Sequence, residues 1–529
     1  MFMAILFLAI AFFTYKRTLF FSLFFQQERY NNFSFTKFIF HKFQLIDKKL
    51  SLLLFAYTIF ATGTKFYKLD MLIVSALFLI FGILTPNPKS NSMKKQLVIT
   101  NRLKRILEIS FILSILFLSN IIHILYTITI QNQYCFCLVM GYVILFIQTI
   151  PFTLIFANIL LFPVEFLTRK YYTSKAKQIL KKYHPVVIGI TGSFGKTSTK
   201  NILNHILSSV SKSMTTARSI NTLMGITQVI REELKPSYKY FIVEIGTAGK
   251  GRIKKICNLV KPQYGILTAV GSAHFENFKS KDAIAKEKFD LIKSVIKNDG
   301  SYIINPNTVD KKYIEKFNAD TTNFSITNTT ISINGIKFKL SYNGKKYDIS
   351  APVFGEHQSE NISLAFIMAL KLGIPADTII ASLKTLPQTE HRQEVKTQGD
   401  LTIIDDAFNS NIAGFKSALS TLHILAKEKK GRAILITPGM VELGKEHNAQ
   451  HTEIANVALQ TCDIVIAVIP ERIQSFVDTF TSGKSNAQKI VQVDSLTQAR
   501  AWIADNAKKN DVILYENDLP DVFESKIKL

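Results

Sequence analysis

A chain of 529 residues is long enough for about three or four domains, which excludes a single small domain. Its 41 phenylalanines, 47% hydrophobic residues and mean hydropathy of +0.18 favour a membrane part joined to a soluble part. The net charge of +25 fits basic loops at a membrane and anionic substrates. The four cysteines have no zinc-binding spacing and form no disulfide framework, which excludes a disulfide-stabilised scaffold.

Apolar runs dominate the first part of the chain and predict a helical membrane unit over residues 1–170. The runs cover residues 3–13, 50–61, 71–85, 109–130 and 135–167. The last two are long enough to cross a bilayer, since a spanning helix needs about 20 residues, whereas the first three are short or interrupted. We therefore predict about five transmembrane helices.

The basic residues orient this unit. Lysines and arginines follow the first, third and fifth runs, while the segment 127–134 carries no charge. Basic loops stay on the cytoplasmic side, so the N-terminus is expected outside and everything after Arg169 in the cytosol, with only Lys65 and Lys68 on the opposite side. We expect a multi-pass protein of the cytoplasmic (inner) membrane, in contact with membrane lipids.

The stretch VVIGITGSFGKTSTK, residues 186–200, predicts a strand, a glycine-rich turn and a helix. Such a turn cradles phosphate, because glycines let backbone N–H groups approach phosphate oxygens and the helix N-terminus adds partial positive charge. Lys196 would reach the β- and γ-phosphates, and the hydroxyl of Thr197 would hold Mg²⁺. The sequence therefore predicts a nucleotide site at this turn.

The remainder is expected to be α/β. Strand-like runs alternate with helical patterns and lie at residues 241–244, 264–268, 401–404, 433–437 and 464–468. This alternation predicts parallel sheets with ligands at the carboxyl ends of the strands. Between residues 302 and 353, short alternating runs with Asn-Gly turns predict a hairpin-rich insertion. A domain boundary is expected near Pro387.

Polar residues follow two of these strands. Glu244 ends one strand, where a carboxylate can hold Mg²⁺ across from the phosphate turn. His274 follows another strand and could ligate a second cation, orient a substrate, or be an ordinary loop histidine. The basic helix over residues 283–290 is by itself typical of a solvated helix face.

Seven segments occur in one order: TGSFGKTSTK, EIGTAGKGRI, ILTAVGSAHFENF, AIAKEKFDLI, GEHQSENISLAF, DDAFNSN and PGMVELGKE. This order resembles the Mur ligase family, the ATP-dependent ligases of peptidoglycan precursor synthesis. DDAFNSN and PGMVELG are most similar to the members that add D-alanyl-D-alanine to UDP-MurNAc-tripeptide. The resemblance implies a P-loop central ATP-binding domain at 171–387, with helices on a parallel sheet, and a Rossmann-like C-terminal domain at 388–529.

The resemblance also assigns residues to ATP. Those matching the triphosphate site are Gly192, Ser193, Gly195, Lys196, Thr197 and Ser198. His357 and Asn361 match positions near the adenine. Arg392 matches the arginine that reaches the phosphates, and Asp406 matches the residue at the ribose. The family closes its C-terminal domain over ATP, so Arg392 and Asp406 are expected to complete the site after closure.

Two Mg²⁺ ions are implied as well, with Thr197, Glu244, His274 and Lys288 as the metal-binding residues. Lys288 matches a lysine that is carbamylated in the family, and Lys286 is the nearby alternative. Asn221 and Thr222 lie in the loop that faces the amino-sugar peptide.

The implied reaction has two steps. The carboxylate of the acceptor peptide attacks the γ-phosphate, giving an acyl phosphate and ADP, and the amine of D-Ala-D-Ala then displaces phosphate. Lys196, Lys288 and His274 are the expected catalytic residues, and two cations would neutralise charge in the transition state.

Departures from the family pattern leave alternatives open. Ile190 stands where the common P-loop has its first glycine, and Phe408 and Ile412 replace a tyrosine and a proline of the family. The usual UDP-binding N-terminal domain is not recognisable, so the muropeptide could be nucleotide-linked or lipid-linked; no nucleic acid partner is expected. The alternatives are an amide ligase resembling the membrane-associated poly-γ-glutamate synthases and a nucleotide-binding membrane scaffold without catalysis.

Overall fold

The computed structural model describes residues 2–41, 48–61, 67–88, 96–129, 135–217, 220–247, 249–271, 278, 280–319, 321–407, 410–441 and 443–517. These residues belong to two compact units, one within Met1–Thr168 and one within Arg169–Asp518. Each unit encloses hydrophobic core residues of its own.

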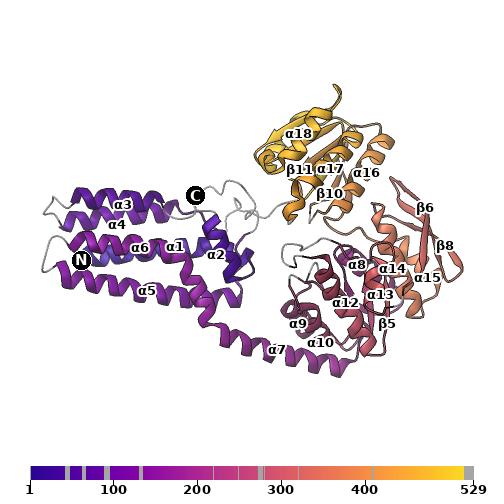
Figure 1. Ribbon diagram of the computed structural model, residues 1–529, viewed down its shortest axis with the longest axis horizontal. Coiled ribbons are helices and arrows are strands. Elements are labelled where there is room, and N and C mark those ends of the chain that lie inside the picture. The colour runs from indigo at the N-terminus through magenta and orange to yellow at the C-terminus, as the bar shows by residue number, and fades with distance from the viewer. Residues whose placement is uncertain are drawn as a thin grey trace. The chain divides into compact units, whose positions relative to one another are not determined.

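The first unit is helical. Its helices are α1 (Phe2–Gln27), α2 (Asn32–His41), α3 (Lys48–Ala61), α4 (Tyr67–Leu84), α5 (Asn101–Thr129) and α6 (Cys135–Leu160). Helix α1 packs against α4, α5 and α6, and these elongated helices lie lengthwise beside one another in Figure 1. Phenylalanines of α1, among them Phe13, Phe20 and Phe24, are fully buried in the core. Burial of such large apolar side chains supplies most of the driving force for this bundle.

The described residues before 170 are mainly helical, as predicted, but the helix boundaries differ from the prediction. The apolar run 3–13 is only part of α1, which continues for 26 residues. The run 135–167 is divided, since α6 ends at Leu160 and α7 (Phe162–Tyr183) begins two residues later. Pro163 explains the break, because a proline lacks an N–H donor and restricts the residue before it.

Two helices among the described residues are long and apolar enough to cross a membrane, Ala4–Gln27 and Gly141–Leu160. The apolar helices Lys49–Phe60 and Leu69–Leu84 are shorter. A buried core helix of a soluble protein and an N-terminal signal sequence meet the same criteria of length and composition. The predicted five spans therefore stay a prediction.

The second unit begins with a parallel sheet. Its strands are β1 (Val186–Thr191), β2 (Ser213–Thr215), β3 (Tyr240–Glu244), β4 (Tyr264–Leu267) and β5 (Ser301–Ile304), in the order β2-β3-β1-β4-β5. The helices that follow them are α8 (Lys196–Ser208), α9 (Leu223–Glu232), α10 (Arg252–Val260), α12 (Lys281–Lys297), α13 (Lys311–Lys316), α14 (His357–Lys371) and α15 (Ala376–Leu383). This confirms the α/β class and the parallel sheet.

Helices cover both faces of this sheet. Successive strand residues point to opposite sides, so alternate residues of β1 pack against different helices. Ile188 and Ile190 of β1 pack with α8 and α14. Val187 of the same strand packs on the other side with α9, α10 and the end of α7. The apolar run that predicted β1 is thus buried on both faces, as is typical of a parallel sheet.

An antiparallel sheet follows, made of β6 (Phe324–Ser332), β7 (Gly335–Tyr342) and β8 (Lys345–Ala351). The turn between β7 and β8 has positive φ at Asn343 (50°) and Gly344 (74°), which is the conformation that an Asn-Gly hairpin favours. The predicted hairpins are confirmed, but they begin at Phe324, because β5 and α13 belong to the preceding parallel layer.

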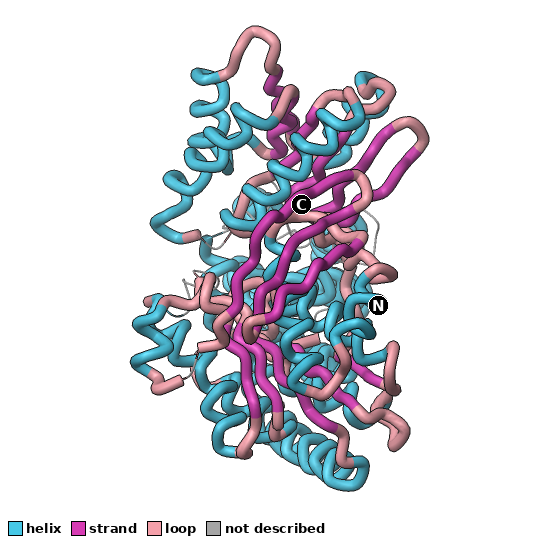
Figure 2. Tube along the Cα trace, turned by 90° about the vertical axis from the view of Figure 1, so that its right-hand side faces the viewer, coloured by secondary structure: helices cyan, strands magenta, loops and turns pink. Residues whose placement is uncertain are grey.

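The last part carries a second sheet. Its strands are β9 (Glu394–Gln398), β10 (Leu401–Asp406), β11 (Ala433–Thr437), β12 (Ile464–Val468), β13 (Lys489–Val493) and β14 (Val512–Glu516), in the order β13-β12-β11-β14-β10-β9. Only β9 pairs antiparallel. Helices α16 (Ile412–Lys429), α17 (His447–Thr461), α18 (Gln474–Gly483) and α19 (Leu496–Asn506) accompany it, and Figure 2 shows the strands in magenta between cyan helices. The carboxyl ends of β10, β11 and β14 therefore meet at one edge.

Candidate active site

The glycine-rich turn of residues 192–195 joins the end of β1 to the first residue of α8. Gly195 has a φ of 79°, and a Cβ atom there would lie 2.5 Å from Oδ1 of Asn361. A Cβ atom on Gly192 would collide with the hydroxyl of Thr268. The backbone N–H of Ser193 donates to the carbonyl of Ala269 at 2.9 Å. Glycine is thus required at both positions, and the turn is fastened to the chain after β4.

Lys196 folds back over this turn. Its Nζ donates to the carbonyl oxygens of Gly192 at 2.8 Å and Ser193 at 3.4 Å. Burial lowers the pKa of Lys196, the charge of Glu244 opposes that shift, and the charge of Arg392 adds to it. Two cations close to one cradle create a positive field that an anionic phosphate group would relieve.

Glu244 lies opposite the turn at the end of β3, with only 1% of its surface exposed. Thr197 Oγ1 donates to Glu244 Oε2 at 2.9 Å, and Asn221 Nδ2 donates to Oε1 at 3.0 Å. Parallel strands bring β1 and β3 side by side, which is why residues 47 positions apart meet. A hydroxyl and a carboxylate oxygen at one point are the donor types that Mg²⁺ prefers.

Lys200 is a member of this cluster that the sequence alone did not reveal. It is fully buried, with Nζ 3.4 Å from Glu244 Oε2 and donating to the carbonyl of Thr216 at 2.8 Å. Its spacing could have indicated its position, because Lys200 follows Lys196 by four residues and so lies one turn further along the same face of α8. Only the burial identifies it as a structural counter-ion of Glu244.

Lys288 lies on α12 and is buried, with 2% of its surface exposed, whereas Lys286 is exposed. Burial lowers the pKa of Lys288 well below its usual value, repulsion by Lys196 lowers it further, and Glu287 opposes the shift. Lys288 is therefore close enough to Lys196 for their charges to interact.

The beginning of α14 contacts the phosphate turn. Thr199 Oγ1 donates to Asn361 Oδ1 at 3.2 Å, and Asn361 Nδ2 donates to Gln358 Oε1 at 3.1 Å. His357 Nδ1 lies 3.0 Å from the hydroxyl of Ser417 on α16. Burial, together with the charge of Arg392, lowers the pKa of His357 to about 4, so its ring is neutral at pH 7.

Arg392 connects the two α/β parts electrostatically. Burial lowers the pKa of Arg392, while the carboxylates of Asp406, Glu244 and Glu516 raise it. Glu244 belongs to the first sheet, and the other two carboxylates end adjacent strands of the second sheet. The guanidinium of Arg392 therefore interacts electrostatically with carboxylates of both sheets.

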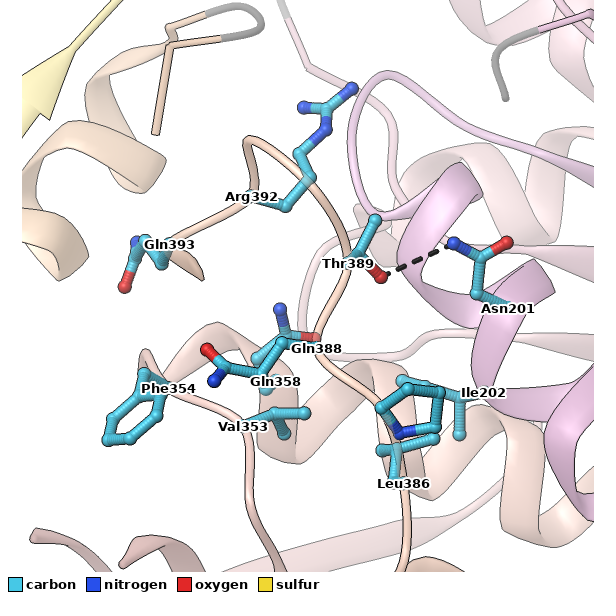
Figure 3. A pocket seen from close by; sticks show the side chains of 11 residues that line it. Asn201, Ile202, Val353, Phe354, Gln358, Leu386, Gln388, Thr389, Arg392 and Gln393 are labelled. Carbon is cyan, nitrogen blue, oxygen red and sulfur yellow. Dashed lines mark hydrogen bonds between the residues drawn. The ribbon is translucent and has the colours of Figure 1, made fainter. Parts of the chain in front are cut away.

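A small pocket lies beside Arg392. In Figure 3, Asn201 on α8 and Thr389 on the linker point toward one another, and Nδ2 of Asn201 donates to Oγ1 of Thr389 at 3.3 Å. The lining combines apolar and amide side chains and consists of Asn201, Ile202, Val353, Phe354, Gln358, Leu386, Pro387, Gln388, Thr389, Arg392 and Gln393. These residues come from α8, from residues 353–358 around the start of α14 and from the linker after α15, so all three segments meet beside Arg392.

Metal-type side chains also gather in the linker next to Arg392. The ligand atoms of His391, Glu394 and Asp405 lie within 4.8 Å of one another. His391 Nδ1 is 2.8 Å from Asp405 Oδ2, and Lys396 Nζ is 2.8 Å from Glu394 Oε2. The ammonium group of Lys396 therefore already neutralises Glu394. The contact between His391 and Asp405 stabilises the turn in which His391 has a φ of 57°.

Asp406 and the acceptor loop complete the predicted set. Asp406 is 8% exposed, and burial raises its pKa to about 7 although Arg392 opposes the shift. Thr222 caps α9, because its Oγ1 accepts from the N–H of Gly225 at 3.3 Å. Ser198 is buried inside the first turn of α8. His274 lies outside the described residues, as does Phe408.

Comparison with known proteins adds independent findings. Residues 190–369 match the Mur ligase middle domain, and residues 391–515 match the Mur ligase, glutamate ligase domain. The UDP-N-acetylmuramoyl-tripeptide–D-alanyl-D-alanine ligase of Escherichia coli strain K12 is 27% identical over 303 residues, covering 55% of this chain and 66% of that enzyme. The ligase of the same name from Bacillus subtilis strain 168 is 26% identical over 363 residues, covering 64% of this chain and 75% of that enzyme.

A solved structure shows the same fold. The MurF ligase from Thermotoga maritima, crystallised in complex with ADP, superimposes with a TM-score of 0.58 at 22% identity. The match covers 66% of this chain and 80% of that chain. At this identity, the likeness concerns the arrangement of the sheets and helices alone.

Proposed function

The chain belongs to the Mur ligase family of ATP-dependent amide ligases, and we propose that it joins D-alanyl-D-alanine to UDP-MurNAc-tripeptide. The observation that carries the proposal is the cluster of Lys196 and Thr197, directly after the glycine turn, with Glu244 at the end of β3. The charge of Arg392 also acts on Lys196. The D-alanyl-D-alanine ligases among the relatives favour this substrate pair over the poly-γ-glutamate alternative.

The residues present fit a magnesium nucleotide. The hydroxyl of Thr197 and the carboxylate of Glu244 are 2.9 Å apart and are oxygen donors. Lys288, if carbamylated, would add a second carboxylate-like ligand, and His274 is the proposed partner of a second ion. Bound Mg²⁺ would supply neutralisation of the phosphate charge.

The protein side chains would then position the reactants. Lys196 would hold the β- and γ-phosphates, with the backbone of residues 192–198 around them, and Arg392 would approach from the linker. His357 and Asn361 are proposed near the adenine and Asp406 at the ribose. Asn221, which donates to Glu244, would bring the acceptor loop to the same edge of the sheet.

In the first step, a carboxylate oxygen of the acceptor peptide attacks the γ-phosphorus and the bond to the β-phosphate oxygen breaks, releasing ADP. In the second step, the amine nitrogen attacks the acyl carbon, the bond to the phosphate oxygen breaks, and inorganic phosphate leaves. The nitrogen loses its proton as the amide forms. Exclusion of water protects the acyl phosphate between the steps.

The acceptor's carrier group is the open part of the proposal. Both family matches begin after residue 189, so the helical unit stands outside the matched part of the chain. We propose a nucleotide-linked muropeptide, with a lipid-linked muropeptide as the second candidate because two apolar helices precede the ligase domains.

A coupled assay tests the proposal. The purified full chain, in detergent, is incubated with ATP, Mg²⁺, UDP-MurNAc-tripeptide and D-Ala-D-Ala. We expect ADP release that depends on both substrates, with formation of the pentapeptide product, and none from the Lys196→Ala variant. ADP release that requires glutamate instead, or release that no amine stimulates, would reject the proposed reaction.

A further inference from the structure

The carboxylate of Glu244 lies in a field of positive charge. Within the described part of the chain, its charge acts on the three cations Lys196, Lys200 and Arg392. The proposed reaction assigns Lys196 and Arg392 to the phosphates of ATP, but it gives Lys200 no part. Lys200 is therefore a cation beside the proposed metal ligand whose presence the reaction does not yet explain.

Lys200 is held in place from two sides. Its Nζ donates to the carbonyl oxygen of Thr216 at 2.8 Å and lies 3.4 Å from Oε2 of Glu244. Thr216 is itself fully buried, and its N–H donates to the carbonyl oxygen of Ile242 on β3 at 3.3 Å. Because the side chain of Lys200 is 0% exposed, its ammonium group is enclosed by protein. The positive charge is thus a fixed part of the fold at this carboxylate.

The oxygen that Lys200 faces is also the oxygen that the proposed metal ion would use. Thr197 Oγ1 donates to the same Oε2 of Glu244 at 2.9 Å, so a hydroxyl, a carboxylate oxygen and an ammonium group meet at one atom. A divalent ion bound to that oxygen would be a near neighbour of the ammonium nitrogen. Like charges at such a distance repel each other even in water, and more strongly in a buried site.

The balance of charge disfavours a metal ion that arrives alone. A carbamate on Lys288 would add a second negative charge to that of Glu244, which is still fewer than the three positive charges. A triphosphate would reverse this balance, because it is multiply negative and would pair with Lys196 and Arg392. Lys200, enclosed by protein, would continue to neutralise Glu244.

We propose that Lys200 makes metal binding at Glu244 depend on the nucleotide, so that Mg²⁺ is held there together with the triphosphate and not before it. This inference rests on the proposed ligase function and adds the order in which its nucleotide site is filled. The sign of the effect separates it from a purely structural role. Loss of a structural support would disorder Glu244 and lower the metal affinity, whereas loss of a repelling charge raises it.

The first test measures Mn²⁺ binding by electron paramagnetic resonance, on the full chain in detergent and without nucleotide. Mn²⁺ replaces Mg²⁺ as the probe because both ions prefer oxygen ligands. The binding that disappears in Glu244→Gln defines the site. At this site, Lys200→Met should bind Mn²⁺ at least about tenfold more tightly than the wild type does.

The matched control is Lys297→Met, which removes an exposed lysine of α12 and should bind Mn²⁺ as the wild type does. Equal Mn²⁺ affinity in the wild type and in folded Lys200→Met would overturn the proposal. A lower affinity in Lys200→Met would also overturn it, because that result assigns Lys200 a structural role alone.

A measurement without this variant guards against a Lys200→Met chain that does not fold. Mg²⁺ alone should leave the apparent Tm of the wild type unchanged, whereas Mg²⁺ with a non-hydrolysable ATP analogue should raise it, because a bound ligand stabilises the folded state. An equal rise with Mg²⁺ alone that is lost in Glu244→Gln would overturn the inference and leave the ligase function standing. If the analogue does not bind with or without Mg²⁺, the proposed ligase function fails and this inference fails with it.

Discussion

At the scale of single residues, the burial of Lys288 distinguishes it from its neighbour. Lys288 is 2% exposed and lies within the charge field of Lys196, whereas Lys286 is exposed. Carbamate formation needs an uncharged amine, and burial favours that form by lowering the pKa of Lys288. These contrasts support Lys288 as the proposed modified lysine.

We predict that Lys288→Ala loses at least about a hundredfold in kcat, the scale of removing one charge-stabilising group. Short carboxylic acids such as formate should restore part of the activity by replacing the lost anionic ligand. ADP release under saturating substrates is the measurement, and Lys286→Ala is the control that should retain activity. A fully active Lys288→Ala would show that the carbamate is assigned to the wrong residue.

The buried lysine Lys200 contributes to the stability of the folded chain through Glu244. Its ion pair with Glu244 is fully enclosed, since the two side chains are 0% and 1% exposed. Lys200→Met would leave the Glu244 carboxylate buried without this cation, which should cost about 3–5 kcal/mol of unfolding free energy. Denaturant unfolding measures the loss, and Lys297→Met, at an exposed position of α12, should change stability by less than about 0.5 kcal/mol. Equal stability of the two variants would contradict this view of Lys200.

At the scale of elements, α17 is joined to the loop after β11 through a buried histidine. His451 is 0% exposed; its Nδ1–H donates to the carbonyl of His447 at 2.7 Å, and its Nε2 accepts from the N–H of Met440 at 3.0 Å. Gly439 in this loop has a φ of 76°, and a Cβ atom there would lie 2.5 Å from Nε2. The neutral ring thus fixes the loop that borders the carboxyl edge of the second sheet.

Acid should weaken this junction. Burial lowers the pKa of His451 from 6.5 to about 4, so between these values the unfolded chain takes up a proton that the folded chain does not. Stability from the neutral ring is therefore present above pH 6.5 and declines as the pH falls toward 4. We expect the apparent Tm to fall over this range and to fall less steeply in His451→Gln, with the exposed His423→Gln as control. An identical slope in all three proteins would refute the assignment.

At the scale of the whole molecule, a helical unit precedes the ligase domains. Helix α7 is continuous over Phe162–Tyr183, and its later residues Ile179, Leu180 and Tyr183 pack into the α/β unit. Earlier residues of the chain form a bundle with the two candidate spans. We propose that this unit anchors the ligase in the cytoplasmic membrane, with the catalytic domains in the cytosol.

Membrane fractionation tests the anchor. The full chain should remain in the membrane pellet after an alkaline carbonate wash and should be released by detergent, because apolar spans resist extraction by pH and salt. The positive charge of the chain alone could hold it to lipids, but such binding is removed by the wash. Recovery in the wash supernatant would contradict the membrane-spanning prediction.

Local sequence determined the elements that depend on local chemistry. The glycine turn, the strands that enclose it and the Asn343-Gly344 hairpin were all readable, because buried apolar runs and positive φ leave signatures within a few residues. The order of the motifs also indicated the family. The separation of α6 from α7 was missed, since the apolar run continues through Pro163.

Tertiary structure alone decided which charges are buried together. Glu516 meets Ser410 across 106 residues, and Lys200 meets the carboxylate that ends β3, so no short pattern could identify either. The local sequence around a charged side chain on a helix or at a strand end is the same whether the side chain is surrounded by water or pairs with another charge. Its pairing, and therefore its energy and its chemistry, is fixed only when the sheets place distant strand ends at one edge.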